Sequence, residues 1–161
     1  MKMFTIADRE DSLLLRRPSC DLSAEAIDCD TYRTLEEKMI VTVIAEHGVG
    51  LAGPQVGLLR RVVAVKRYDK EGEPFEVYPN ISITEMRGEF ENGPEGCLSV
   101  PDCYGFVPRS RDIDIRYTSA KTLRDTVETV QGFTAVIFQH ECDHLDGVLY
   151  IDKTVDVESY R

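Results

Sequence analysis

The chain has 161 residues, 42% of them hydrophobic, and this size and composition predict one globular domain over residues 1–161. The formal net charge is −10, from 29 acidic and 19 basic residues, which argues against a basic patch and a nucleic-acid partner. No apolar run is long enough to cross a membrane, and the run at 13–15 is too short for a signal peptide. Five cysteines at irregular spacings favour reduced thiols, so we expect a cytoplasmic protein.

The first predicted helix covers residues 30–46, where apolar side chains recur at helical spacing. One aspartate, either Asp28 or Asp30, is expected to cap its start, and Gly48 is expected to end it. A glycine-rich loop, residues 48–57, follows. It contains Gly-x-Gly, but no strand precedes it and no Lys-Ser or Lys-Thr pair follows, so a phosphate-binding role is disfavoured.

Strands are predicted in the middle of the chain. Residues 62–65 form a β-branched run typical of a buried strand, and two further short strands are expected on either side of a break at Pro79. Residues 112–117 alternate between apolar and polar side chains, and residues 126–130 predict a weaker strand. Residues 87–93 are polar and are predicted to form a loop.

The second predicted helix covers residues 133–145, with Gly132 before it and Gly147 after it. The order of helix, several strands and helix indicates an α+β fold with mostly antiparallel sheets packed around this second helix, rather than a doubly wound nucleotide-binding fold. Residues 152–161 are polar and are expected to be peripheral.

The second helix contains the pattern His-Glu-x-x-His at positions 140–144. Residues four apart share one helical face, so His140 and His144 can reach one metal ion, and Glu141 can lean over its open position as a general base. The pattern also arises by chance, and histidine pairs on helices sometimes only form hydrogen bonds. Because the chain has only three histidines and two of them are here, we favour metal binding.

A third ligand must come from elsewhere. Some zinc proteases place a histidine ten positions after the first, which is Tyr150 here; others use a glutamate farther downstream, and only 17 residues follow His144. A conventional zinc protease is therefore disfavoured. Cys97 is the obvious upstream candidate, because a thiolate binds divalent ions and the flanking Gly96 permits close approach.

Three blocks of the chain together resemble the peptide deformylase family in order and spacing. They are Gly-Val-Gly-Leu-Ala-Gly-Pro-Gln at 48–55, Glu-Gly-Cys-Leu-Ser at 95–99, and Gln-His-Glu-Cys-Asp-His-Leu-Asp-Gly at 139–147. The resemblance covers roughly residues 13–152. It implies a hydrolase that removes the N-formyl group from the N-terminal formyl-methionine of newly made polypeptides and releases formate.

The resemblance also implies residue roles. The metal ligands would be Cys97, His140 and His144. Glu141 would be the general acid and base, while the Gln55 side chain and the Leu98 backbone N–H would stabilise the oxyanion. One divalent ion is implied, Fe²⁺ in cells, with Zn²⁺ or Ni²⁺ as alternatives in preparations, and it would lower the pKa of a bound water to about 7.

The resemblance further implies a substrate pocket. Its residues would be Val49, Gly50, Gly96, Tyr104, Phe133, Val136 and Ile137. Val136 and Ile137 lie on the His140 face of the helix, where plain core packing is an equally good explanation. Two positions depart from the family pattern. Gly53 replaces an alanine, which would loosen Gln55, and Tyr104 replaces an arginine that contacts the bound peptide in many members.

The expected partners are N-formyl-methionyl peptides and nascent chains, with the ribosome as a further candidate, and the protein is expected to be a monomer. Two alternatives remain open: an amidase acting on another small formamide, suggested by Tyr104, and a non-catalytic binding protein, which would not need the general base Glu141. His47 is expected to be a surface residue near a helix end rather than a ligand.

Overall fold

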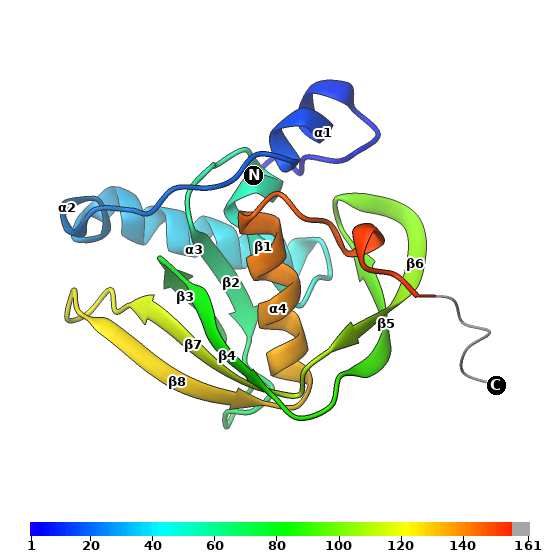
Figure 1. The fold of residues 1–161 in the computed structure, drawn as a ribbon. Helices are drawn as coiled ribbons and strands as arrows, with labels where there is room; N and C mark the ends of the chain where they lie inside the picture. The colour runs from blue at the N-terminus through cyan, green and yellow to red at the C-terminus, as the bar shows by residue number, and fades with distance from the viewer. Residues whose placement is uncertain (156–161) are drawn as a thin grey trace.

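The computed structural model describes residues 1–155 and shows four α-helices among them (Figure 1). The helices are α1 (Arg9–Leu15), α2 (Ala24–Ile27), α3 (Asp30–Ala45) and α4 (Phe133–Leu145), with 3-10 turns at η1 (Gly53–Val56) and η2 (Tyr150–Asp152). No described helix is long and apolar enough to span a membrane. The expectation that residues 152–161 are peripheral falls mostly on 156–161, which lie outside the described residues.

The described strands form three antiparallel sheets. The first contains β1 (Gly50–Ala52), β2 (Val62–Lys66) and β3 (Phe75–Pro79) in that order. The second has the order β4 (Ser82–Arg87), β7 (Asp112–Thr118) and β8 (Asp125–Gln131). The third is the hairpin of β5 (Glu91–Cys97) and β6 (Val100–Arg109). The predicted α+β class with antiparallel sheets is confirmed.

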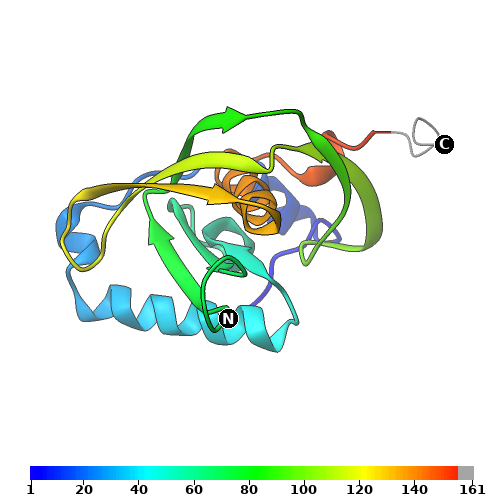
Figure 2. The same cartoon turned by 90° about the horizontal axis from the view of Figure 1, so that it is seen from below.

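Helix α4 lies at the centre of the fold, seen end-on in Figure 2. It contacts β1 and β2 of the first sheet and β4 and β8 of the second, so sheets surround it. Ten of its 13 residues are buried. It spans the predicted residues and is followed, after Asp146, by Gly147 at φ 74°, the left-handed conformation that glycine adopts without steric cost.

Strand β2 explains why residues 62–65 are apolar without alternation. Val63 and Val65 face the core around α4, whereas Val62 and Ala64 face a second core beneath α3. All four side chains are fully buried, as expected for a strand covered on both faces. The first sheet is therefore sandwiched between two helices, which fixes β1 and the glycine-rich segment next to α4.

Helix α3 is capped differently from the prediction. Cys29 occupies the N-cap position and its side chain makes no capping hydrogen bond to the helix, so neither aspartate caps the helix there. At the other end the left-handed residue is His47, at φ 57°, and not Gly48. Gly48 N–H donates to the Val43 carbonyl and His47 N–H to the Ile44 carbonyl, which is the Schellman arrangement.

Two segments predicted as loops contain strands. Residues 87–93 include the end of β4 and the start of β5, and the glycine-rich loop contains β1 and η1. The β5–β6 hairpin leaves most side chains of β5 partly or fully exposed, so its sequence shows no alternation of apolar and polar residues. Cross-strand pairing from Glu91 with Arg109 to Cys97 with Val100 defines it instead.

Candidate active site

Three side chains predicted as metal ligands lie together at the end of β5 and on α4. The ligand atoms of Cys97, His140 and His144 all lie within 4.8 Å of one another. The shortest contact described between them is 3.2 Å, from Cys97 Sγ to His144 Nε2. The two imidazole rings come from successive turns of α4, with centroids 5.1 Å apart, as the i, i+4 spacing requires.

This donor set fits one divalent metal ion. Two imidazoles and a thiol are ligands that Zn²⁺ and Fe²⁺ accept, and their atoms surround a common point. Burial lowers the pKa of His144 well below its ordinary value, which keeps the ring neutral as coordination requires. Burial also lowers the pKa of His140, but Cys97 and Glu95 outweigh it and raise that pKa to about 10, so a bound cation must displace this proton.

A network of charged side chains orients His140. Its Nδ1 lies 2.8 Å from Glu95 Oε1, and the buried Arg109 donates to Glu95 at 2.9 and 3.0 Å and to Asp143 at 2.6 Å. Burial would raise the pKa of Glu95, but hydrogen bonds from His140 and Arg109 outweigh it and lower that pKa. Glu95 therefore remains an anion that can hold the Nδ1–H of His140 and leave Nε2 for a metal.

Glu141 points into the site without a partner among the described residues. Its side chain is buried, and Oε2 accepts no hydrogen bond there. Burial of the carboxyl raises its pKa to about 7, which suits a group that must both accept and deliver a proton near neutral pH. The carboxyl lies against Gly50, where a Cβ would stand 2.9 Å from Glu141 Cδ. Gly50 thus makes room for the carboxyl.

Gln55 is fixed at both ends of its side-chain amide. Oε1 accepts a 2.9 Å hydrogen bond from the Ala52 N–H, and Nε2 donates to Ser99 Oγ at 3.2 Å and to Cys97 Sγ at 3.5 Å. The side chain is 1% exposed. Gly53 precedes it in η1, and these bonds oppose the loosening expected from Gly53, which stays a prediction.

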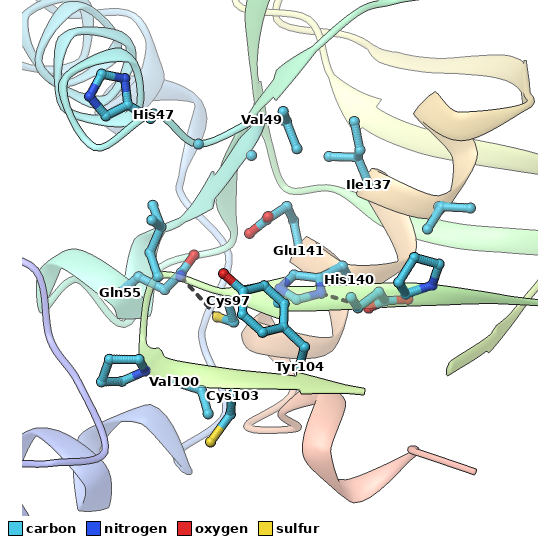
Figure 3. A pocket seen from close by; sticks show the side chains of 18 of the residues that line it. His47, Val49, Gln55, Cys97, Val100, Cys103, Tyr104, Ile137, His140 and Glu141 are labelled. Carbon is cyan, nitrogen blue, oxygen red and sulfur yellow. Dashed lines mark hydrogen bonds and ion pairs between the residues drawn. The ribbon is translucent and has the colours of Figure 1, made fainter. Parts of the chain in front are cut away.

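Two of the three candidate ligands, Cys97 and His140, line a cavity of about 460 Å³, and His144 lies behind them in contact with Cys97. In Figure 3, Val49 and Ile137 lie on one side of the cavity, and Cys97, Gln55 and Tyr104 on another. The cavity lining includes Leu98 and every residue predicted for the substrate pocket: Val49, Gly50, Gly96, Tyr104, Phe133, Val136 and Ile137. Ile137 also belongs to the core around α4, so its position is compatible with both interpretations, and the pocket role stays a prediction.

Sequence reasoning missed several residues of the site. His47 is exposed, as expected, but it lines the cavity, and Pro94, Val100 and Cys103 line it as well. Tyr104 is 86% exposed and its ring covers Gly96, where a Cβ would stand 2.9 Å from Cε1. Arg109 lies outside the three sequence blocks, and its contacts with Glu95 and Asp143 place it beside the candidate ligands.

Known proteins resemble this chain in both sequence and structure. A family model described as polypeptide deformylase matches residues 3–160. The chain belongs to the peptide deformylase family. The peptide deformylase of Leptospira biflexa is 36% identical over 147 residues, which are 87% of this chain and 82% of that protein. The crystal structure of the Thermotoga maritima peptide deformylase has a TM-score of 0.84 at 32% identity, covering 96% of this chain and 97% of the other.

A Met-Ala-Ser-bound class I type b peptide deformylase from Acinetobacter baumannii has the same TM-score of 0.84, at 30% identity over 95% of this chain and 97% of that one. The enzyme described here is therefore a hydrolase that removes the N-formyl group from polypeptides. The resemblance drawn from the three sequence blocks is confirmed, as is the enzymatic activity inferred from it.

Proposed function

We propose that this deformylase acts in the cytoplasm on the N-terminal formyl-methionine of nascent chains, with Cys97, His140 and His144 holding one divalent ion. The observation that carries the proposal is the Glu141 carboxyl, buried beside this ligand set with an oxygen that lacks a partner among the described residues. Binding alone would not favour such a group, because an unpartnered buried carboxyl costs stability. A role as the general base in catalysis would account for a carboxyl kept there at that cost.

We assign the ion as Fe²⁺ in the cell, with Zn²⁺ or Ni²⁺ able to occupy the same ligands in preparations. When bound, the ion supplies Lewis acidity that polarises the formyl oxygen and lowers the pKa of water. Elemental analysis of protein purified without oxygen tests the assignment. One equivalent of metal per chain is expected. Its loss from each of the single variants Cys97→Ser and His140→Ala would identify these two residues as ligands.

The side chains around the formyl group would divide the remaining work. Water adds to the formyl carbon, and Glu141 accepts its proton and then delivers a proton to the leaving amine nitrogen as the C–N bond breaks. Gln55 Nε2 and the Leu98 backbone N–H would donate hydrogen bonds to the oxygen that gains negative charge. The bond from Gln55 Oε1 to the Ala52 N–H supports this role, because it fixes which end of the amide faces the site.

The methionine side chain would occupy the part of the cavity lined by Val49, Phe133, Val136 and Ile137, which we call the methionine pocket. Its apolar lining suits an unbranched thioether, and a cavity of about 460 Å³ is in the usual range for small ligands. Gly50, Gly96 and Tyr104 would lie along the peptide that follows the methionine.

A formate-release assay tests the proposed function. Iron-loaded protein kept free of oxygen should release formate from formyl-Met-Ala-Ser, and the isosteric Glu141→Gln variant should be slower by about 10²- to 10⁴-fold. Equal rates for the two proteins would remove Glu141 from the reaction. If formate is released no faster than in buffer, formyl-Met-Ala-Ser is not a substrate and the proposed function is wrong.

A second candidate substrate class is a small formamide without a peptide. Tyr104 favours it, because this exposed ring stands at the mouth of the cavity where many family members carry a peptide-contacting arginine. A panel of formylated amines assayed beside formyl-Met-Ala-Ser separates the two. We propose that the peptide is preferred, that residues 1–161 form one catalytic domain, and that the protein is a monomer meeting its substrates at the ribosome. Size-exclusion chromatography and co-sedimentation with ribosomes test the last two points.

A further inference from the structure

Tyr68 lies just beyond the end of β2 and outside the described lining of the cavity. Its ring packs against the ring of Phe133, with centroids 5.5 Å apart and planes inclined by 47°. Phe133 is the first residue of α4 and lines the cavity. The aromatic pair therefore joins a segment outside the site to a wall of the methionine pocket.

The segment that carries Tyr68 is fixed at several points. The Lys66 N–H donates to the Val49 carbonyl at 2.9 Å, which ties the segment to another residue of the pocket. Arg67 is 2% exposed, and its guanidinium lies 5.6 Å from the centroid of the Phe138 ring, one helical turn after the start of α4. Lys66 Nζ lies 5.0 Å from the centroid of the Tyr68 ring. The backbone at Tyr68 is thus fixed, and its ring, 36% exposed, lies between Lys66 and Phe133.

Phe133, in contrast, is held weakly by the core. Its side chain is 48% exposed. It begins α4 directly after Gly132, and a glycine at the N-cap has no side chain that could cap the helix. A half-exposed ring at a helix start has rotamer freedom that packing must remove. Contact with Tyr68 removes part of it, because inclined aromatic pairs attract beyond the area they bury.

We infer that Tyr68 is a positioning residue for methionine specificity: it holds the Phe133 ring against the methionine pocket and acts on the substrate only through that ring. The inference rests on the proposed function. It assigns a role to a residue that belongs to none of the three sequence blocks.

The test compares two substrates in five variants. Tyr68→Ala should lower kcat/KM for formyl-Met-Ala-Ser by about two- to tenfold, mainly through KM, and leave formyl-Ala-Ala-Ser unchanged, since alanine does not reach Phe133. Tyr68→Phe should retain the wild-type values because it keeps the ring. In a Phe133→Ala background, Tyr68→Ala should have no further effect. Phe90→Ala, which removes another exposed ring outside the cavity, is the matched control.

Three results would overturn the inference. One is an equal loss for both substrates, which would indicate a general structural role. Another is a loss in the Phe133→Ala background as large as in the wild type. The third is a Tyr68→Ala variant, folded by its thermal transition, that keeps full kcat/KM for the methionine substrate. Failure of the proposed function gives a different result, because the wild-type protein would then release no formate from either peptide.

Discussion

Gly50 offers a direct test of how the proposed general base, Glu141, is placed. This residue lies in β1, opposite Val65 of β2, and its φ is not in the left-handed region, so alanine causes no backbone strain there. A Cβ at this position would stand 2.9 Å from both Cγ and Cδ of Glu141 and closer still to Oε1. Real Cβ atoms almost never approach so closely, so in a Gly50→Ala variant the Glu141 carboxyl must move.

The size of the effect follows from the role proposed for Glu141. General acid–base catalysis contributes about 10²- to 10⁴-fold, which is about 2.7 to 5.4 kcal/mol of barrier. A base displaced by a methyl group loses most of this, so kcat of Gly50→Ala should approach that of Glu141→Gln. Metal content and the thermal midpoint should change little, because the three atoms nearest the new methyl all belong to Glu141 and β1 remains paired.

The assay is formate release from formyl-Met-Ala-Ser by metal-loaded protein, with metal content and thermal unfolding measured on the same samples. Gly93→Ala is the matched control, because Gly93 is also a strand glycine and its added Cβ would meet only the far end of Arg111, at 3.7 Å. If Gly50→Ala keeps kcat within threefold of the wild type, the carboxyl is not confined as described. If it fails to fold while Gly93→Ala folds, the assigned cause is wrong.

Three further predictions concern the supporting structure. Arg109→Met should weaken metal binding about 10- to 100-fold, because Glu95 would no longer be held against His140; competition with a chelator measures this, and unchanged affinity would contradict it. Gly53→Ala should destabilise the protein by about 1 to 3 kcal/mol, since its Cβ would stand 2.7 Å from two backbone carbonyl oxygens; denaturant unfolding decides. Arg87 and then Thr129 lower the pKa of Asp114 to about 2, so this group stabilises the fold above pH 3.8 and the contribution is lost as pH falls through 2. Thermal midpoints of Arg87→Met should therefore fall less steeply than those of the wild type between pH 5 and 2.

The elements best predicted from sequence are those whose buried side chains recur at a regular spacing or form a continuous apolar run. The limits of α4 followed from its apolar residues and Gly147, and β2 followed from four residues buried between two helices. The β5–β6 hairpin showed neither a period nor an apolar run, because both of its faces are largely exposed. Each of its strands is defined by pairing with the other strand and not by its own sequence pattern. Glu95 and Arg109 meet only through that pairing, so their network could not be derived from local pattern.

The ligand set shows the same division within a single site. His140 and His144 are neighbours because of helical geometry alone, so their spacing in sequence was sufficient to place them together. Cys97 reaches them only because β5 ends beside α4, and its thiol is also within reach of the Gln55 amide from η1. Elimination of downstream ligands and the family resemblance supplied this residue, not its own surroundings in sequence.

The position of Gln55 shows why a residue's conformation cannot be judged from its neighbours in the chain. Glycine at position 53 suggests freedom, yet the carbonyl oxygens of Leu58 and Arg60 lie where a Cβ would be, so the main chain there is tightly packed. Glycine serves close approach at this point rather than mobility. The same holds for Gly50 beside Glu141. Gly50 therefore lets β1 approach Glu141 of α4, and Gly53 lets η1 approach the main chain at Leu58 and Arg60. Larger residues at these two positions would displace the proposed carboxyl base and the proposed amide donor, respectively.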